Sequence, residues 1–267
     1  MPVHARSPPA DYPARVPPTD VDRVSLLLGT SLFDDLSPAE LEPLARAASI
    51  RRVVRGEHVF EAGDPADALY IVASGQLRDA IYSDEGAEIT HSLWEPGQCF
   101  GEVGFFAPSR TRVMSVLALE PSTLLILARE PLTAFLERHP SVAMKLLEKM
   151  ASTSQWQTGM FLTLARRPLA DRVVLRLLDL AESSGSSDAE LATSPRVSQS
   201  TLATMVGASR ENVNRALTGL VTAGILRTEG GRYLIPSPDA VRRRIVAGWP
   251  ALELPADPDD VRPAPAT

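Results

Sequence analysis

The stretch that most constrains the fold is residues 197–220, VSQSTLATMVGASRENVNRALTGL, in which two short helical patterns meet at Gly207. Apolar residues recur at helical spacing on both sides of this glycine: Leu202, Ala203 and Val206 before it, and Val213, Ala216, Leu217 and Leu220 after it. A serine precedes each pattern, and a serine hydroxyl can cap a helix by accepting from a backbone N–H of the first turn. The sequence therefore predicts a helix-turn-helix capped at Ser198 and Ser209.

The second helix of this motif carries four polar side chains on the face opposite its apolar residues, namely Arg210, Glu211, Asn214 and Arg215. Helical positions one, two, five and six lie on one side, so these side chains can enter a DNA major groove together. Arginine pairs with guanine and glutamate accepts from cytosine, each contact contributing about 1–3 kcal/mol of discrimination. A solvated face with an internal Glu211–Arg215 ion pair is the simpler alternative. The turn, the caps and the groove chemistry together favour base reading.

Charge is unevenly distributed along the chain. The 267 residues carry 27 basic and 33 acidic side chains, a net charge of −6, which by itself argues against a nucleic-acid partner. Residues 196–246, however, contain eight arginines and three acidic residues, a net charge of +5. The basic segment therefore coincides with the predicted helix-turn-helix.

Cysteine and histidine usage limits the possible chemistry. Cys99 is the single cysteine, which excludes an internal disulfide and a multi-cysteine metal site within one chain. The four histidines show no metal-ligand spacing, and a cupin-type metalloenzyme would need a cluster that His58 and His91 do not supply. No catalytic constellation is present, so we expect no enzymatic activity and no metal.

The ends of the chain and its hydropathy suggest a cytoplasmic protein without a membrane partner. No apolar run approaches the ~20 residues of a membrane span, and the N-terminus lacks the apolar core of a signal peptide. Residues 1–21 are rich in proline and residues 249–267 are rich in proline and acidic, so both are expected to be disordered.

Between these ends the pattern predicts a β domain at residues 22–139. The capping box Ser37-Pro38-Ala39-Glu40 starts a helix that runs to about Ala48. Short strands separated by turn signals follow, and they are expected at residues 52–54, 59–60, 68–73, 76–81, 88–93, 112–119 and 124–128. Many short strands at this spacing are typical of a barrel or jelly roll.

A long helix is expected at about residues 142–166, within a segment from 140 to 167. Residues recur along it at alternating spacings of four and three, as in a coiled-coil seam: Ala143, Leu147, Met150, Ser154, Gln157, Phe161 and Leu164. This predicts a parallel homodimer. Packing of the stripe on its own barrel is the alternative, but it does not explain Ser154 and Gln157, because polar seam residues usually fix register or face a ligand.

The C-terminal segment, residues 168–248, is predicted to be a winged helix-turn-helix. Pro168 starts a new helix, which ends in a flexible loop at residues 183–187. After the helix-turn-helix, residues 224–226 and 230–235 are expected to form a two-stranded wing, and residues 239–246 a short basic helix.

A barrel, a long helix and a winged helix in this order resemble the CRP/FNR family of bacterial transcription regulators. The likeness spans roughly Leu32 to Val246 and is carried by three motifs: GDPADALYIVASGQL (63–77), PGQCFGEVGFF (96–106) and GASRENVNRAL (207–217). It implies an α+β fold with a cyclic-nucleotide-binding-like β jelly-roll barrel, a long dimerisation helix and a C-terminal winged helix-turn-helix domain. It also implies a homodimer that regulates transcription, with RNA polymerase as a further partner.

For the DNA site, the resemblance implies that Arg210, Glu211 and Arg215 read bases and that Ser198, Gln199 and Ser209 contact phosphate. A TGTGA-like half-site is then expected. A two-fold dimer would place its recognition helices about 34 Å apart, one turn of double-stranded DNA, so the site should be a palindrome.

For the barrel, the resemblance implies a pocket for cyclic AMP as an effector. Phe100, Gly101, Glu102 and Val103 form its phosphate and ribose cassette, in which glycine permits close approach to the backbone and a carboxylate suits a ribose 2′-hydroxyl. Relatives follow with an Arg-Ser or Arg-Thr pair whose guanidinium neutralises the cyclic phosphate. Two registers match this chain, Arg112-Val113 by counting and Arg110-Thr111 by chemistry, and both stay open.

The base end of the implied pocket departs from the family pattern. Counting without gaps places Gln157 and Thr158 where cyclic-AMP-binding relatives have Thr-Ser. Ser92 matches a polar family position, whereas His91 replaces an apolar residue, and a strand histidine without a ligand role is its simpler interpretation. Val113 and Gln157 motivate the alternative that DNA binding is independent of cyclic AMP. Cys99 in the cassette motivates a second alternative, a switch by oxidation or nitrosylation. A nucleotide-binding regulatory subunit of an enzyme would not need the base-reading helix.

Overall fold

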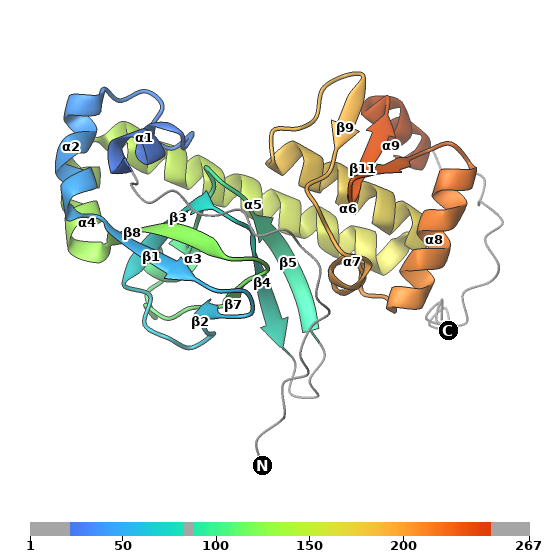
Figure 1. Ribbon diagram of the computed structural model, residues 1–267, viewed down its shortest axis with the longest axis horizontal. Helices are drawn as coiled ribbons and strands as arrows, with labels where there is room; N and C mark the ends of the chain where they lie inside the picture. The colour runs from blue at the N-terminus through green and yellow to red at the C-terminus, as the bar shows by residue number, and fades with distance from the viewer. Residues whose placement is uncertain (1–21, 83–87, 247–267) are drawn as a thin grey trace, which may run out of the picture.

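The computed structural model describes residues 22–82 and 88–246. The predicted N-terminal arm and C-terminal tail lie outside this range. Within it, the chain forms a β domain and a smaller helical domain, and one long helix, α5, runs from the first to the second (Figure 1).

The β domain consists of two four-stranded sheets with antiparallel neighbours. One sheet has the order β1 (Ser49–Val53), β8 (Ser122–Ala128), β3 (Ala68–Ser74) and β6 (Cys99–Phe100). The other has the order β2 (His58–Phe60), β7 (Ser115–Ala118), β4 (Leu77–Tyr82) and β5 (Glu88–Trp94). Between them lies an apolar core that includes Val72, Leu77, Phe100 and Leu124. The predicted β barrel or jelly roll is confirmed.

Three predicted strands differ by more than one residue in their starts, and one strand was missed. The strands predicted at residues 52–54 and 124–128 begin earlier, at Ser49 and Ser122. Residues 112–114 were expected to begin a strand, but β7 starts at Ser115. Arg112 instead bonds through its backbone to the loop between β2 and β3, donating to the Asp64 carbonyl at 2.8 Å and accepting from the Gly63 N–H at 2.9 Å. The two-residue strand β6 was not predicted, because two residues are too few to show an alternating pattern.

Three helices cover one face of the barrel: α1 (Arg23–Leu28), α2 (Pro38–Ala47) and α4 (Arg129–Arg138). The predicted capping box starts α2, where the Ser37 backbone N–H donates to Glu40 Oε2 at 2.8 Å. Apolar residues of these helices pack on the sheet of β1, β3 and β8 in a second core that includes Phe33, Leu41, Leu69 and Phe135. The barrel therefore has one covered face, and its other sheet faces α5 and the second domain (Figure 1).

Helix α5 spans Pro140–Arg166, 27 residues, and the next helix, α6 (Leu169–Ser183), follows directly after Pro168. At its start α5 buries Val142 and Leu146 in the core under α4. The change of direction between the helices is local, because Arg167 has an extended backbone and Pro168 serves as the N-cap residue of α6. The prediction that Pro168 restarts the helix is confirmed.

The second domain contains α6, α7 (Gln199–Val206), α8 (Arg210–Thr222) and α9 (Pro238–Val246) around an apolar core that includes Val173, Leu177, Leu202 and Val213. A three-stranded antiparallel sheet flanks these helices, in the order β10 (Arg227–Glu229), β11 (Arg232–Pro236) and β9 (Leu191–Thr193). The predicted helix-turn-helix is confirmed as α7 and α8, which meet at Gly207 with φ 62°.

The wing differs from its prediction in position and in strand number. Residues 224–226 are not a strand, because Ile225 and Leu226 turn into the domain core. The hairpin lies three residues later, around Gly230 and Gly231 with φ 55° and 77°, the left-handed values that a two-residue hairpin turn requires. The third strand, β9, was not predicted.

The two domains are in direct contact. Leu93 of β5 belongs to the core of the second domain, and α7 packs on β5. Thr204 of α7 and Thr90 of β5 are joined by a hydroxyl hydrogen bond of 2.8 Å. The Gln98 amide donates to the Ser183 carbonyl at the end of α6, at 2.6 Å. Among the helices of the described ranges, none has the length and apolar character needed to cross a membrane.

Candidate effector cavity and DNA-binding surface

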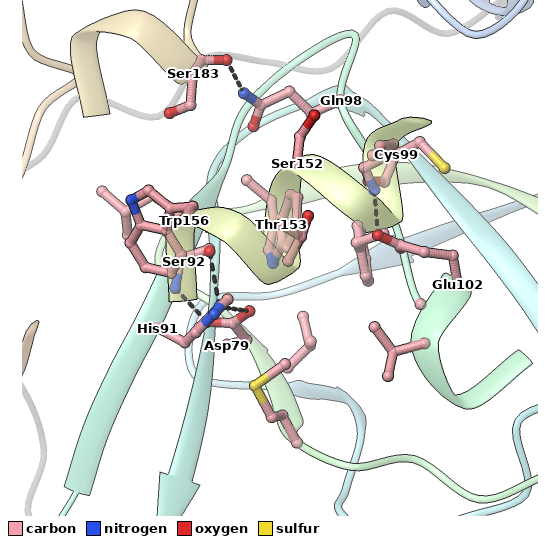
Figure 2. Close-up of a pocket in the computed structure, with 18 of the residues that line it drawn as sticks. Asp79, His91, Ser92, Gln98, Cys99, Glu102, Ser152, Thr153, Trp156 and Ser183 are labelled. Carbon is pink, nitrogen blue, oxygen red and sulfur yellow. Dashed lines mark hydrogen bonds and ion pairs between the residues drawn. The ribbon is translucent and has the colours of Figure 1, made fainter. Parts of the chain in front are cut away.

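A cavity of about 680 Å³ lies between the barrel, α5 and α6. Its wall is built from β4, β5 and β6, from the short helix α3 (Glu102–Phe106), from the loop that leads into β7, and from the central part of α5. Figure 2 shows the two groups of polar side chains that face it: Asp79, His91 and Ser92 beside Trp156, and Glu102 beside Cys99, with Ser152 and Thr153 of α5 between.

Gly101 and Glu102 form the turn from β6 into α3. Gly101 has φ 95°, a left-handed conformation, and a Cβ at this position would lie 2.8 Å from Arg112 Nη1. The position therefore requires glycine on both grounds. Glu102 is 4% exposed and its carboxylate lies 2.5 Å from the Lys149 ammonium of α5. Lys149 also donates to the Cys99 carbonyl at 2.6 Å, so α5 is tied to this turn.

Of the two candidate arginines, Arg110 and Arg112, it is Arg112 that lies at the cavity. It is 4% exposed, and it donates to the Gly101 carbonyl at 2.9 Å and to the Ala68 carbonyl at 2.7 Å. Its guanidinium lies 4.2 Å from the centre of the Phe60 ring. Burial lowers the pKa of the Arg112 guanidinium. Its Nε is buried and has no hydrogen-bond partner among the residues that the structure describes.

Of the other residues in the two alternative Arg pairs, Val113 lies at the cavity and Arg110 and Thr111 do not. Val113 lines the cavity and is 57% exposed. Arg110 and Thr111 are both exposed and do not contribute to the cavity wall. Arg110 adopts φ 51°, and the Thr111 hydroxyl donates to Ser109 at 3.2 Å. The structure thus brings the Arg112-Val113 pair to the cavity and leaves the Arg110-Thr111 pair outside it.

Asp79 also lines the cavity, although the sequence did not predict it there. Arg78 pairs with Leu93 and Ala80 pairs with Thr90, so Asp79 alone faces two residues of β5, His91 and Ser92. Such a β-bulge re-aims side chains. Here it allows the Ser92 N–H to donate to the Asp79 carboxylate. In the sequence, Asp79 could have been recognised only as a carboxylate in the middle of a predicted strand, where an apolar residue is usual.

Helix α5 contributes Gln157 to this end of the cavity, as predicted, but not Thr158. Gln157 Nε2 lies 3.1 Å from His91 Nε2. Thr158 is exposed, lies outside the cavity wall and donates to the Ser154 carbonyl at 3.1 Å. Ser152, Thr153 and Trp156 line the cavity and were not predicted. Residues three and four apart lie on the same face of a helix, so the prediction of Gln157 could have been extended to Thr153.

Two charged residues of α6 complete the wall from the side of the second domain. Arg176 donates to the His91 carbonyl, and its guanidinium lies 4.6 Å from the centre of the Trp156 ring. Burial lowers the pKa of Arg176 to about 10. Trp156 Nε1 donates to Asp179 at 2.9 Å. His91 and Trp156 are therefore in direct contact with α6, the first helix of the second domain.

The polar face predicted for α8 is exposed. Arg210, Glu211, Asn214 and Arg215 all face solvent, whereas Val213, Ala216 and Leu217 between them are buried. The predicted caps are present. The Ser209 hydroxyl accepts from the Asn212 N–H at 3.2 Å, and the Ser198 hydroxyl accepts from the Thr201 N–H at 3.0 Å.

The predicted phosphate contacts lie beside this face, at the starts of the two helices. Ser198 and Ser209 are exposed and Gln199 is half-buried. The Gln199 amide donates to Asn214 Oδ1 at 3.0 Å, which joins α7 to α8. Arg215 donates to Asn212 Oδ1 within α8. Arg215 and Asn214 are thus positioned by neighbours on the same surface.

The stripe predicted as a dimer seam is largely uncovered in the single chain. Leu147 is 57% exposed, Phe161 73% and Leu164 38%. Ser154 is also exposed, whereas Met150 is half-buried. The barrel buries Val142 and Leu146 and leaves these three apolar side chains exposed. Gln157, in contrast, reaches His91 of β5. An apolar face of this length on a helix is typical of a protein contact.

Cys99 is buried between β6 and the cavity, and burial raises the pKa of its thiol to about 12. The thiolate is the reactive form of cysteine, so this environment disfavours redox chemistry at Cys99. Within the described part of the chain, no group of three or more His, Cys, Asp or Glu side chains is arranged to hold a metal ion.

Comparison with known proteins identifies both halves of the chain. Residues 50–139 match the cyclic nucleotide-binding domain family, and residues 171–244 match the Crp-like helix-turn-helix domain family. The cyclic AMP receptor protein of Thermus thermophilus is 32% identical over 203 residues, which cover 76% of this chain and 91% of that protein.

Two further relatives carry different ligands in their names. The CRP-like cAMP-activated global transcriptional regulator of Mycobacterium tuberculosis is 28% identical over 220 residues, 82% of this chain and 98% of that protein. The structure of the c-di-GMP responsive global regulator CLP from Xanthomonas campestris is 26% identical, with a TM-score of 0.57, and the match covers 75% of this chain and 99% of that one.

Proposed function

The chain belongs to the CRP/FNR family of transcription regulators, and on this premise we propose that it binds a palindromic DNA site as a homodimer under the control of a cyclic nucleotide. A transcription regulator with a nucleotide-binding domain and a Crp-like helix-turn-helix is not an enzyme. Three finer statements are proposals: the DNA site rests on the geometry of α8, the dimer on the exposed stripe of α5, and the ligand on the cavity.

The observation that carries the DNA proposal is the exposed polar face of α8. Arg210 and Glu211 occupy the first turn, where a recognition helix meets base edges, and Arg215 follows one turn later. Side chains of this chemistry suit a TGTGA-like half-site. Ser198, Gln199 and Ser209 at the two helix starts offer donors for phosphate oxygens.

The proposal of a nucleotide effector rests on orphaned and charged groups around one cavity. Arg112 supplies a buried cation whose Nε–H has no partner among the described residues, and Gly101, which has no side chain, lies beside it. A cyclic phosphate would match both groups. Glu102 would accept from a ribose hydroxyl. The names of two relatives make cyclic AMP the first ligand to test.

The proposed dimer is supported by the exposed apolar stripe of α5. Leu147, Phe161 and Leu164 lie at heptad spacing on a face that the barrel does not cover. A parallel pair of α5 helices would bury this face. It would also set two α8 helices on one side of the molecule, as a palindrome requires. RNA polymerase would be the partner of the DNA-bound dimer.

The contacts at His91 suggest how the cavity would control DNA binding. His91 touches Gln157 and Trp156 of α5, and its carbonyl accepts from Arg176 of α6. A movement of these groups would be transmitted to α6 and to the Thr90–Thr204 hydrogen bond, which joins the DNA-binding domain to the barrel. A ligand that favours one arrangement of these contacts would thereby change the orientation of α8.

Fluorescence anisotropy of a labelled TGTGA-type palindrome tests the proposal, with and without cyclic nucleotide at constant salt, because salt alone changes such affinities strongly. We expect a DNA affinity that rises at least tenfold with ligand, about 1.4 kcal/mol of coupling. Tight binding that ignores every cyclic nucleotide would leave the DNA proposal standing and reject the effector. Equal affinity for a scrambled sequence would reject the base-reading role of α8.

A further inference from the structure

Asp79 presents a buried acceptor to the cavity that the protein itself does not satisfy. The residue is 1% exposed, and one carboxylate oxygen, Oδ1, accepts from the Ser92 N–H. The other oxygen, Oδ2, is buried and has no hydrogen-bond partner among the described residues. Burial of a carboxylate oxygen costs free energy unless a donor meets it. An acceptor placed on a cavity wall in this way is suited to a ligand N–H group.

His91, which lies next to Asp79, makes its hydrogen bonds to Gln157 and Ser92. The Gln157 amide nitrogen only donates, so its contact with His91 Nε2 makes this ring nitrogen the acceptor and places the proton on Nδ1. Nδ1 lies 2.9 Å from the Ser92 hydroxyl and 3.4 Å from Asp79 Oδ2. The Nδ1–H therefore bonds to the nearer Ser92 hydroxyl, and Asp79 Oδ2, on the wall of the cavity, has no hydrogen bond within the described residues.

A second orphaned group on the same wall is a donor. Trp94 Nε1 is buried and lacks a hydrogen-bond partner within the described residues. The Trp94 ring itself is fixed, stacking on Phe100 at a centroid distance of 5.6 Å. The wall thus offers a carboxylate acceptor at Asp79 and a fixed N–H donor at Trp94.

We propose that Asp79 selects the base of the effector and that the cavity prefers guanine to adenine. Guanine presents two adjacent N–H donors, N1–H and the N2 amino group, to which one carboxylate can bond bidentately. Its carbonyl O6 is an acceptor for a donor such as Trp94 Nε1. Adenine presents its N6 amino group next to N1, a lone-pair acceptor that a carboxylate repels. This inference rests on the proposed nucleotide effector and names its base.

The test is calorimetric titration of the full-length protein with cyclic GMP, cyclic AMP and cyclic di-GMP. We expect at least one guanine ligand to bind tenfold or more tightly than cyclic AMP, because a site built to bond polar groups discriminates strongly when they are missing. The cyclic di-GMP arm separates a mononucleotide from a dinucleotide ligand. Binding is read directly, so the result does not depend on DNA.

Asp79→Asn is the informative variant, since it keeps the size of the side chain and an oxygen for the Ser92 N–H. An amide pairs with the donor and acceptor of adenine. We therefore expect the preference for the guanine ligand to fall at least tenfold and the affinity for cyclic AMP to rise. The control is Glu137→Gln, the same carboxylate-to-amide change at an exposed position of α4 outside the cavity wall, which should leave the preference unchanged.

Each outcome decides the matter. Equal or tighter binding of cyclic AMP by the unmodified protein overturns the inference and leaves the proposed effector intact. A guanine preference that Asp79→Asn does not alter also overturns it, because another residue then reads the base. If none of the three nucleotides binds, the effector proposal fails with it, while binding of the DNA palindrome still reports separately on α8.

Discussion

The ammonium of Lys149 on α5 lies 2.5 Å from the carboxylate of Glu102 at the start of α3. The Glu102 side chain is 6% exposed and that of Lys149 is 30% exposed, so the ion pair is largely shielded from water. It joins the long helix to the turn that carries Gly101. Through this pair, the position of α5 and the geometry of the cavity depend on each other.

Lys149→Met should lower the free energy of unfolding by about 1–3 kcal/mol, because it leaves the buried Glu102 carboxylate without its cation. Urea denaturation measures the loss. The control is Lys145→Met, whose partners Asp34 and Asp35 are exposed and whose removal should cost at most about 1 kcal/mol. Adding Glu102→Gln to Lys149→Met should recover most of the loss. Equal losses for the two lysine variants would contradict the prediction.

Gly101→Ala tests whether close packing against Arg112, in addition to the left-handed backbone, disfavours a side chain at this position. A Cβ at Gly101 would meet Arg112 Nη1 at 2.8 Å, whereas one at Gly56, with φ 81°, meets nothing within 4 Å. Both substitutions carry the cost of a left-handed alanine, about 1–2 kcal/mol. Gly101→Ala should cost at least about 1 kcal/mol more, since Arg112 must move. Thermal unfolding of the two variants compares them, and equal costs would remove the contact from the explanation.

Cys99 should react slowly with a thiol reagent in the folded protein. With a thiol pKa of about 12, roughly one molecule in ten thousand carries the thiolate at pH 8, and the side chain is buried as well. Labelling followed by absorbance should become fast in urea, where Cys99 is exposed. Fast labelling without denaturant would restore the possibility of a redox switch at this position.

The elements with strong local signals were predictable from the sequence. The turn glycine and both serine caps of the helix-turn-helix are visible in the sequence. The capping box at Ser37 and Glu40 is likewise a local pattern. The wing was placed about three residues too early, because Ile225 and Leu226 resemble a strand but belong to the core. Such a difference is set by tertiary packing, which a local pattern does not contain.

The cavity was predictable only in part. Gly101 and Glu102 came from a motif, but the choice between Arg110 and Arg112 depended on which guanidinium reaches the Gly101 carbonyl across the loop. Asp79 became visible only through the bulge that sets it against His91 and Ser92. Register shifts of this kind arise from pairing between strands and leave no periodic trace in either strand alone.

Arg210→Ala should relax specificity at one base pair of the DNA site, with a loss of about 1–3 kcal/mol for the preferred base only. The reason is its exposed position in the first turn of α8, directly after the Ser209 cap. Anisotropy with a set of single-base variants of the palindrome measures the effect. The control is Arg55→Ala, which removes the same charge from an exposed loop of the barrel. A loss that is uniform across sequences would assign Arg210 to a phosphate contact.

Adjacent leucines on α5 separate dimer formation from folding. Leu146 is 2% exposed and packs in the core under α4, whereas Leu147 is 57% exposed on the proposed seam. Leu146→Ala should therefore cost about 2–5 kcal/mol of folding free energy. Leu147→Ala should change the stability of the isolated chain by at most about 0.5 kcal/mol but weaken the dimer, because its side chain loses contact only with a second copy.

Sedimentation across a range of protein concentrations, together with urea denaturation, measures both quantities. Phe161→Ala, which alters a 73% exposed residue of the same stripe, should behave like Leu147→Ala. A monomeric unmodified protein at micromolar concentration would reject the seam. A dimer that neither exposed substitution weakens would place the contact elsewhere, and the spacing of the two α8 helices would then have to be set by a different surface.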